Sequence, residues 1–357
     1  MERVQLTRIA VVGYGYWGSK HVRVLSAIPG VDVSVVESNQ TRRDEATKHF
    51  SKVGSAARLD QVLDSIDAVV VATPPGSHFE VALEAISAGK HVLVEKPLTT
   101  SVAEAEMLVH AADNMGVQLM VGHTFEYNAA VHKLKEIIDS GELGRVRYID
   151  TARLSLGLYQ RDVNVIWDLA PHDLSIVSYL LNELPSAVSV WGQRHIGHHH
   201  VDVAHVRLEF PDLETHAVIH TSWLDPCKVR RVTVAGERKM VVYNDMSDTE
   251  RIRVYDVGVE ELEQDPGSHE RPVSYRTGDI VSPYVHFREP LTVQDSHFVD
   301  CVRMNVTPNT PGRRGAEIVR VLAATDESLL LGDGVRVSLR HEDRLVQSHR
   351  LNGEAVR

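Results

Sequence analysis

The sequence predicts two domains: an N-terminal α/β domain with a doubly wound parallel sheet, and an α+β domain with a mainly antiparallel sheet. Three observations lead to this fold class. A glycine-rich turn joins a strand to a helix near the N-terminus, strands then alternate with helices as far as residue 122, and most later segments show the two-residue alternation of strands. A chain of 357 residues is long enough for both, so we expect domains at residues 1–122 and 123–357.

The first element is a strand, turn and helix that together form a predicted phosphate cradle. An apolar, β-branched run at residues 9–12 stops at the pattern Gly13-x-Gly15-x-x-Gly18, and helix-like composition resumes at residues 21–25. The first glycine permits a sharp turn, the second lets a pyrophosphate approach the backbone, and the third lets the helix pack closely on the strand. Because a helix N-terminus offers N–H donors and the positive end of a dipole, the segment predicts dinucleotide binding.

The second strand predicts which dinucleotide binds. Residues 31–36 read as a buried strand that ends in Glu37, about twenty residues after the glycine turn, where a carboxylate accepts a hydrogen bond from the ribose 2′-hydroxyl of NAD. The carboxylate disfavours a 2′-phosphate, but Arg42 and Arg43 follow closely and could accommodate one, so NADP stays open. The alternative, a glycine turn that binds nothing, is disfavoured by the complete context of strand, turn, helix, strand and acid.

Two more loops of this domain follow predicted strands. Residues 67–72 form a strand that ends in the loop at residues 73–78, and residues 91–94 lead into Glu95-Lys96-Pro97. Helices are expected at residues 79–88 and 102–114, and a last strand at 118–121. Ligands of parallel sheets bind beyond the carboxyl ends of the strands. The predicted cofactor-binding residues are Gly13, Gly15, Tyr16, Trp17, Gly18, Glu37, Thr73, Pro74, His78, Glu95 and Lys96.

The second domain is predicted to consist mainly of strands. A helix at residues 130–140 opens it, and another from about residue 171 to residue 181 interrupts the strands. Residues 260–288 are charged and rich in Pro, Gly and Ser, so we expect a long loop there, followed by helices at 295–303 and 315–331. The strands predict a mainly antiparallel sheet and are expected at residues 146–153, 187–191, 204–210, 215–223, 230–235, 239–244 and 251–256.

The composition limits the partners and the compartment. A net charge of −11 argues against nucleic acid or an anionic membrane as the main partner. The first strand begins within a few residues of the N-terminus without a leader-like segment, and no apolar run approaches the ~20 residues that span a bilayer. Cys227 and Cys301 form neither a disulfide framework nor a CxxC pair. We therefore expect a cytoplasmic protein in a reducing compartment.

A second group of chemically active residues lies in the helix that interrupts the strands. Asp168 and His172 are four residues apart, so they share a face if the helix has begun by Asp168. Because proline is tolerated in a first turn, Pro171 places the pair at a helix N-terminus. For the spacing alone, an N-cap Asp168 followed by a polar His172 is the simpler interpretation.

Taken together, these motifs resemble the glucose-fructose oxidoreductase, inositol dehydrogenase and MocA family over nearly the full length. Its members carry a Rossmann domain, a Glu-Lys-Pro motif after a strand and an Asp-x-x-x-His pair on a helix of an open-sheet C-terminal domain, which match residues 95–97, Asp168 and His172. Many members have a glycine-rich run before the Asp, where this chain has residues 164–167, so the substrate pocket is expected to differ in shape. The first loop, Gly-Tyr-Gly-Tyr-Trp-Gly, looks like that of members from nucleotide-sugar and antibiotic-sugar pathways.

The resemblance implies an oxidoreductase, and the residues suit that chemistry. Oxidising a secondary alcohol requires a base for the hydroxyl proton as hydride leaves for the nicotinamide. His172 suits this role because an unperturbed imidazole, with a pKa of ~6.5, is largely neutral at pH 7. Asp168 could orient the ring, and Lys96 could either hydrogen-bond the same oxygen or relay the proton, two roles that stay open.

The sequence therefore predicts an NAD(P)-dependent oxidoreductase that acts on a ring secondary alcohol or ketone of a sugar, with a nucleotide-linked sugar as the leading substrate. A cyclitol or free-sugar dehydrogenase is the alternative within the enzyme class. The alternative of another class is a non-catalytic dinucleotide-binding sensor or scaffold. The joint presence of Lys96, Asp168 and His172 favours the enzyme.

Other residues are weaker candidates. His195 and the histidines at residues 198–200 suggest a metal tract, but adjacent histidines in a predicted loop are more often a solvated turn, so no metal is expected. His123 and Phe125 follow the last strand of the first domain and are candidates for the substrate side of the crevice. The predicted substrate-binding residues are Tyr127, Asn128, Tyr159, Arg161 and Asn164.

The open sheet also predicts assembly. A sheet with one face uncovered by helices must bury that face, and the apolar alternation through residues 204–223 suggests that the sheet of another subunit does so. We expect a homodimer or homotetramer formed through the C-terminal sheet.

Overall fold

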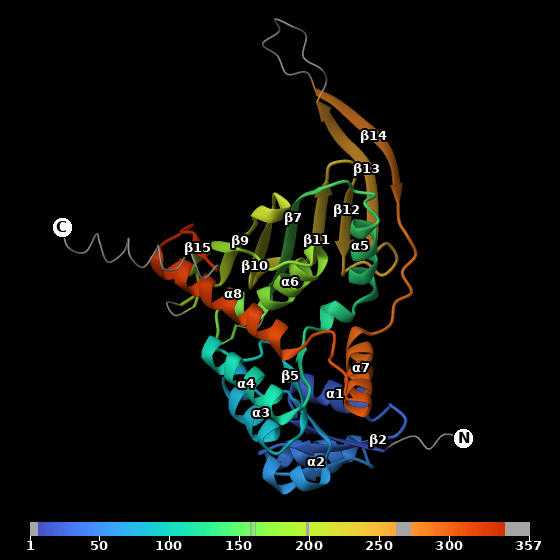
Figure 1. Cartoon of the computed structure of the whole chain (residues 1–357), viewed down its shortest axis with the longest axis vertical. Helices are drawn as coiled ribbons and strands as arrows, with labels where there is room; N and C mark the ends of the chain where they lie inside the picture. Colours follow the sequence, from blue (N-terminus) through green and yellow to red (C-terminus); the bar gives the residue numbers. More distant parts are fainter. Residues whose placement is uncertain (1–5, 158, 161, 198–199, 262–272, 340–357) are drawn as a thin grey trace, which may run out of the picture. The chain divides into compact units, whose positions relative to one another are not determined.

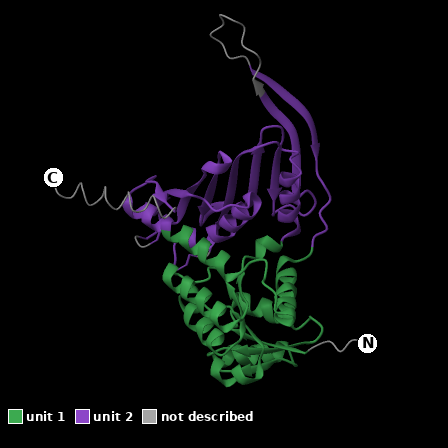
Figure 2. Ribbon diagram, viewed as in Figure 1, with its two compact units in different colours: residues 1–127, 288–323 green, residues 128–287, 324–357 purple. Residues whose placement is uncertain are grey.

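The computed structural model describes residues 6–157, 159–160, 162–197, 200–261 and 273–339. The chain forms two compact units (Figure 2): unit 1 contains residues 1–127 and 288–323, and unit 2 contains residues 128–287 and 324–357. This division differs from the expected boundary at residue 122. Residues 288–323 join unit 1 because helix α7 (Pro290–Met304) packs on helix α1 (Tyr16–Leu25), and Thr310 exchanges two hydrogen bonds with the backbone of Val121, at 2.9 and 2.8 Å.

Unit 1 is built on a parallel sheet, as predicted. Within its described residues, six strands lie in the order β3-β2-β1-β4-β5-β6, and every pairing is parallel. The central strands consist mainly of apolar, β-branched residues and are buried on both faces. This pattern is typical of a parallel sheet covered by helices on each side. The strands are β1 (Thr7–Val12), β2 (Val31–Val36), β3 (Gly54–Ala56), β4 (Ala68–Val71), β5 (His91–Glu95) and β6 (Leu119–Gly122).

The helices of unit 1 pack in pairs. Helix α3 (His78–Ser87) contacts α4 (Val102–Met115), and α1 contacts α7, while α2 (Gln40–His49) lies beside β2 and β3 (Figure 1). Two short 3₁₀ segments, η3 (Pro75–Ser77) and η4 (Thr124–Tyr127), follow β4 and β6. The strand order places β1 between β2 and β4, where the direction of winding reverses and where such sheets bind ligands.

Unit 2 is built on a mixed, mostly antiparallel sheet, which confirms the predicted fold class. The described strands lie in the order β14-β13-β12-β11-β7-β10-β9-β8-β15, and β7 with β10 is the parallel pair among them. They are β7 (Val146–Leu156), β8 (Ala187–Gln193), β9 (Val203–Phe210), β10 (Thr215–Ser222), β11 (Leu224–Gly236), β12 (Met240–Asn244), β13 (Ile252–Glu261), β14 (Val273–Val281) and β15 (Val337–Ser338).

The loop expected at residues 260–288 is wrong in part. Strand β13 continues to Glu261, and β14 pairs with it in an antiparallel ladder. Most of β14 is exposed, including its large apolar side chains, so neither face of this strand is buried in the described residues. Backbone hydrogen bonds to β13, which leave little trace in the composition, define this strand.

Helix α6 (Val165–Leu181) begins six residues before the expected start at residue 171. The side chain of Asn164 caps it by accepting hydrogen bonds from the backbone of Ile166 and Trp167, at 3.0 and 3.1 Å. Pro171 therefore lies inside the helix, and not in its first turn. The cap and the burial of residues 165–167 outweigh the one backbone hydrogen bond that proline cannot donate.

One face of the sheet in unit 2 packs on α6, which contacts β7, β9 and β10, while α5 (Ala129–Asp139) contacts β12 (Figure 1). Helix α8 (Gly312–Leu331) ends beside β8, where the Ser328 hydroxyl accepts a hydrogen bond from the Val190 backbone at 3.0 Å. The alternating apolar side chains of residues 204–223 are buried on this helix-covered side. Contrary to the expectation from the sequence, this alternation does not mark a subunit interface. The other side carries polar rings, including His205 stacked on His220 with ring centroids 4.0 Å apart.

No helix in the described part of the chain is long and apolar enough to cross a membrane.

Candidate functional site

The loops predicted to form the cofactor crevice begin at neighbouring strand ends of unit 1. Val12 pairs with both Val36 and Val71, so the glycine turn starts between Glu37 and the loop that contains Thr73. Glu95 pairs with Gly122, which puts Lys96 beside His123 at the ends of β5 and β6. The predicted convergence of these loops at one edge of the sheet is confirmed.

The glycine turn has the geometry of a phosphate cradle. Gly13 has a φ of +92°, and a Cβ added there would lie 2.7 Å from the Ala72 carbonyl oxygen. A Cβ on Gly18 would lie 1.8 Å from the Gly13 carbonyl oxygen. Beside Gly15, in contrast, no described atom lies within 4 Å of the Cβ position. The fold itself requires two of the glycines, and the third borders open space at the N-terminus of α1, a position at which proteins commonly bind phosphate groups.

Two aromatic side chains project from the first turn of α1. Tyr16 is 73% exposed, and the ring of Trp17 packs against it edge to face with centroids 5.4 Å apart. The Lys20 ammonium lies 4.6 Å from the centre of the Tyr16 ring. Both rings border the cradle without belonging to the core, so they are free to contact a bound ligand.

Glu37 is held as a carboxylate beside the cradle. It is only 8% exposed and accepts hydrogen bonds from the backbone N–H groups of Tyr14 and Asn39, each at 2.9 Å. Burial opposes ionisation, but these N–H groups and the Arg42 guanidinium, 3.9 Å away, outweigh it and lower the pKa of Glu37. Arg43 donates to the backbone carbonyl of Glu37. The ribose position predicted for NAD therefore faces a fixed negative charge.

His78 joins two of the predicted cofactor loops. Its ring nitrogens lie 2.8 Å from the Pro97 carbonyl oxygen and 2.9 Å from the Thr73 carbonyl oxygen, and the side chain is buried. Both ring nitrogens contact backbone carbonyl groups, so His78 links the loop of Thr73 and Pro74 to the Glu95-Lys96-Pro97 turn. Pro74 itself is exposed at the edge of the sheet.

A buried ion cluster lies beneath Lys96. The Glu95 Oε2 atom accepts a hydrogen bond from the Lys96 backbone N–H at 3.1 Å, and Oε1 lies 3.0 Å from Nε2 of His21. The other ring nitrogen of His21 is 2.9 Å from Asp295. Burial lowers the pKa of His21, but Asp295 and Glu95 outweigh it and raise that pKa to about 10. The cluster leaves no signal in the sequence, because His21 and Asp295 are 274 residues apart and neither belongs to a motif.

His123 is a buried, neutral group next to Lys96. Its side chain is 1% exposed, and neither ring nitrogen has a hydrogen-bond partner among the described residues. Burial, together with the positive charges of Arg314 and Lys96, lowers the pKa of His123 to about 3.

The Asp168 and His172 pair lies on α6 in unit 2, one helical turn apart, so the continuous helix gives them a shared face. Both side chains are partly buried. The carboxylate of Asp168 accepts a hydrogen bond from the indole of Trp223 at 3.0 Å, and the ring of Tyr159 packs on Trp223 with centroids 5.0 Å apart. Lys96, the third predicted catalytic residue, lies in unit 1, whereas Asp168 and His172 lie in unit 2.

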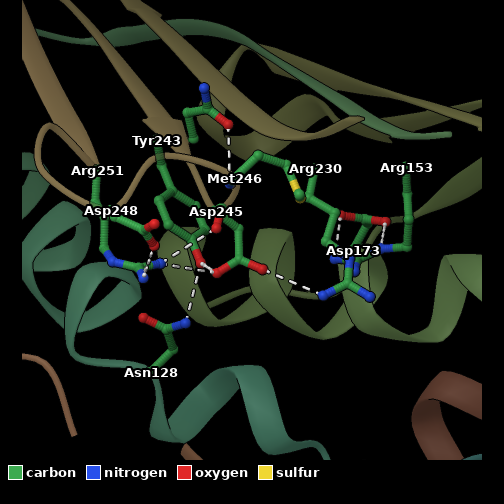
Figure 3. A network of polar contacts seen from close by, with 10 residues as sticks. Asn128, Arg153, Asp173, Arg230, Tyr243, Asp245, Met246, Asp248 and Arg251 are labelled. Carbon is green, nitrogen blue, oxygen red and sulfur yellow. Dashed lines mark hydrogen bonds and ion pairs between the residues drawn. The ribbon is translucent and has the colours of Figure 1, made fainter. Parts of the chain in front are cut away.

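A polar network anchors α6 to the sheet of unit 2 (Figure 3). Arg153 donates two hydrogen bonds to Asp173, at 2.7 and 3.1 Å, and both side chains are buried. Asp173 follows His172 directly, so this bidentate pair fixes the rotation of the helix that carries the predicted base. Nearby, Tyr243 donates to Asp245 at 2.8 Å and accepts from Asn128 at 3.0 Å.

The predicted substrate-binding residues fall into different environments. Asn128 and Asn164 cap α5 and α6, and Asn164 also donates to Asp326 at 3.1 Å. Tyr127 is buried in unit 1, where its hydroxyl lies 3.3 Å from that of Thr310. Tyr159 is 37% exposed, its ring packs on Trp223, and its hydroxyl donates a hydrogen bond to Asp202 at 3.0 Å. Arg161 lies outside the described residues.

The described residues contain no group of three or more His, Cys, Asp or Glu side chains arranged to hold a metal. His195 instead pairs with Asp202, with its Nδ1 atom 2.8 Å from the carboxylate. Residues 198 and 199 of the histidine tract lie outside the described part of the chain.

Two family models match the chain. Residues 7–123 match a model described as an oxidoreductase family with an NAD-binding Rossmann fold, and residues 131–242 match the GFO/IDH/MocA C-terminal domain. Together they cover both the cofactor loops and the Asp168 and His172 pair.

The sequence identity to individual relatives is low. Over 252 residues the chain is 28% identical to scyllo-inositol 2-dehydrogenase (NADP(+)) IolW of Bacillus subtilis, which covers 66% of this chain and 68% of the relative. Over 186 residues it is 31% identical to the UDP-N-acetylglucosamine 3-dehydrogenase of Acidithiobacillus ferrooxidans, covering 52% and 58%. The matched regions thus span 68% and 58% of the lengths of these two relatives. Among solved structures, GenD2 from gentamicin A biosynthesis in complex with NAD is similar, with a TM-score of 0.79, 25% identity and coverage of 95% and 98%.

Proposed function

The chain belongs to the GFO/IDH/MocA family of oxidoreductases and carries its NAD-binding Rossmann domain, and from this premise we propose that it is an NAD(P)-dependent sugar dehydrogenase or ketoreductase. The reaction is hydride transfer at a ring secondary alcohol or ketone. The observation that carries the proposal is the combination of an open glycine cradle and an ionised Glu37 with a lysine that follows strand β5 of the same parallel sheet. A scaffold that binds a dinucleotide without turnover has no need of Lys96, Asp168 and His172.

The proposed roles follow from the chemistry of each group. Bound NAD supplies the hydride acceptor at the nicotinamide. His172 removes the proton of the substrate hydroxyl, and Lys96 donates a hydrogen bond to the same oxygen and stabilises its developing negative charge. Asp168 favours the imidazolium that His172 becomes, and the Trp223 indole holds the Asp168 carboxylate in place. In the reverse direction the same groups return the proton to a carbonyl oxygen.

NAD is the proposed cofactor in preference to NADP. Glu37 is ionised and buried, so a 2′-phosphate placed beside it would meet a like charge. Arg42 and Arg43 both make contacts at Glu37, through its carboxylate and its carbonyl. Binding a 2′-phosphate would require these guanidinium groups to leave those contacts.

The proposed substrate is a nucleotide-linked sugar, with a cyclitol as the alternative. A relative named UDP-N-acetylglucosamine 3-dehydrogenase supports a nucleotide-linked sugar. The relatives named scyllo-inositol and inositol 2-dehydrogenases support the cyclitol. Both classes present a ring secondary alcohol, so the catalytic proposal is the same for each.

A substrate panel tests the proposed function. The protein is mixed with NAD⁺ or NADP⁺ and, in separate assays, UDP-N-acetylglucosamine, myo-inositol, scyllo-inositol or glucose 6-phosphate, and reduced cofactor is followed by absorbance. We expect NAD⁺ reduction with the nucleotide sugar, and reduction with an inositol instead would favour the cyclitol alternative. NADH binding without turnover of any compound, in either direction with the matching ketones, would favour the sensor or scaffold.

A further inference from the structure

His21 occupies a position that the proposed mechanism does not use. It lies in the second turn of α1, its side chain is 0% exposed, and its two ring nitrogens contact carboxylates on two other elements. Nε2 is 3.0 Å from Glu95 at the end of β5, and Nδ1 is 2.9 Å from Asp295 on α7. Glu95 is also confined from the side of β6, because a Cβ on Gly122 would lie 3.2 Å from its Oε2 atom.

The charges in this cluster follow from its hydrogen bonds. An ionised carboxylate only accepts, so a ring between two of them must donate from both nitrogens, and that form of histidine is the imidazolium. Glu95 and Asp295 are the ionisable groups that face the ring, and Gln294 adds a hydrogen bond to Asp295 at 3.4 Å. The Asp295 and Glu95 charges, against the opposing effect of burial, keep the pKa of His21 at about 10. His21 is therefore protonated throughout the neutral range, while burial raises the pKa of Asp295 above its ordinary value.

The cluster ends at the backbone of the proposed catalytic lysine. Glu95 uses Oε1 for His21 and Oε2 for the Lys96 N–H, so a continuous chain of hydrogen bonds runs from α7 through α1 to Lys96. The same helix α1 begins at the glycine cradle. Buried ion pairs often contribute little net stability compared with apolar residues of the same volume, but they fix one geometry.

We infer that His21 is a positioning residue: by joining Glu95 to Asp295 it holds the Lys96 turn at a fixed place relative to the glycine cradle. The inference rests on the proposed function insofar as Lys96 acts on substrate. His21 itself touches neither substrate nor cofactor in this account.

The test compares His21→Gln with His91→Gln. Glutamine has one amide donor group and cannot donate to Glu95 and Asp295 on opposite sides. His91 is a matched control because it lies at the amino end of β5, the strand that ends in Glu95. Its ring accepts a hydrogen bond from the Gln118 backbone at 3.0 Å. Amide hydrogen exchange is measured by mass spectrometry on the peptide that contains residues 95–99. We expect exchange in this peptide to be at least about tenfold faster in His21→Gln, while peptides from β1 and α3 stay unchanged.

Turnover and its pH dependence give the second readout. With NAD⁺ and the substrate found by the panel, His21→Gln is expected to lower kcat about tenfold or more, with a much smaller change in NADH affinity. The Glu95 charge would then lack its cation one residue from Lys96, so the limb of the pH profile that depends on Lys96 should move to higher pH. A structural defect alone would lower kcat and thermal stability but leave that limb in place. Asp295→Asn, which keeps the contact between His21 and Glu95, should speed exchange by less than His21→Gln does. Because it removes a negative charge and leaves the cation of His21 in place, it should not move that limb to higher pH.

Two results would overturn the inference. One is unchanged exchange at residues 95–99 in both His21→Gln and Asp295→Asn. The other is ¹⁵N NMR of histidine-labelled wild-type protein in which the His21 ring, identified by its loss in His21→Gln or its shift in Asp295→Asn, loses a proton near pH 6.5. Failure of the proposed function looks different, because the wild-type protein would then turn over no compound of the panel, whatever the exchange data show. Failure of the role proposed for Lys96 would appear as intact turnover in Lys96→Ala.

Discussion

At the scale of single residues, Glu37 controls the choice of cofactor. Its carboxylate is fixed by the Tyr14 and Asn39 N–H groups, so it cannot turn away from a 2′-phosphate without losing both. We expect NADH to bind at least about tenfold more tightly than NADPH in fluorescence titrations, the effect of one unfavourable contact worth about 1.4 kcal/mol. Glu37→Gln, which keeps the shape and removes the charge, should narrow this gap. Equal or tighter binding of NADPH by the wild-type protein would show that Arg42 or Arg43 dominates.

His21 makes the stability of the protein depend on pH in a defined direction. The pKa of His21 is about 10 in the folded protein and about 6.5 in an unfolded chain, because Asp295 and Glu95 outweigh the effect of burial. A raised pKa contributes stability that is fully present below the unfolded value and is lost as pH rises through the folded value. The melting temperature of the wild-type protein should therefore fall between about pH 6.5 and pH 10 more steeply than that of His21→Gln. Parallel curves for the two proteins would contradict this assignment.

Some residues of the candidate site could be predicted from the sequence, and others could not. The glycines and Glu37 were predictable because a short segment encodes both the turn and the space beside it. His21 and Asp295 were not, because their meeting depends on the return of residues 288–323 to unit 1. The capping roles of Asn128 and Asn164 become visible only once the helix starts are known.

At the scale of elements, α6 determines how Asp168 and His172 are presented. Its start depends on Asn164, which caps the helix and donates to Asp326. Asn164→Ala should lower the free energy of unfolding by about 1–2 kcal/mol, the typical cost of losing an N-cap. The matched control is Asn39→Ala, since Asn39 caps the exposed helix α2 through a single hydrogen bond to Arg42. Urea unfolding in which Asn164→Ala costs no more than Asn39→Ala would show that the buried residues 165–167 define the start without the cap.

Elements with strong periodicity were predictable, and those without it were not. Strands β1, β4, β5 and β6 stand out because both faces are buried and apolar, whereas β3 is short and mostly exposed and lacks such a signal. Pro171 predicts a helix start at residue 171, six residues after the observed start of α6, because proline usually marks a helix boundary. Here the helix continues through the proline from a buried first turn. The composition of residues 260–288, charged and rich in Pro, Gly and Ser, predicts a loop and hides β14, a strand whose residues are mostly exposed.

At the scale of the whole molecule, we propose that the helix-free face of the sheet in unit 2 pairs with a second copy of this chain. The face is more polar than expected, since the apolar alternation of β9 and β10 is buried on the α6 side. Its rings form stacked pairs across strands, His205 with His220 and Tyr148 with His216, which gives a flat surface suited to a second sheet. Light scattering at micromolar concentration should give a dimer or tetramer.

A substitution on that face tests the same proposal. Val218 lies on β10 between Arg207 and Asp150 of the neighbouring strands, near the middle of the face. Val218→Glu should lower the measured mass, because a new carboxylate would be buried in the interface. The control is Asp139→Asn at the end of α5, away from the sheet face. A wild-type protein that is monomeric, or an assembly that tolerates Val218→Glu, would contradict assembly through this sheet.

The central claim, that Lys96 and His172 perform acid-base chemistry on a hydroxyl during NAD-linked hydride transfer, is tested most directly by single-turnover kinetics. Lys96→Ala and His172→Ala are compared with Lys90→Ala, a control just before β5 whose side chain donates to the Ile66 carbonyl at 2.9 Å. The first two variants should transfer hydride about 10²-fold more slowly than the wild-type protein while NADH binding stays nearly intact, and Lys90→Ala should keep the wild-type rate. Near-normal hydride transfer by either Lys96→Ala or His172→Ala would contradict the account.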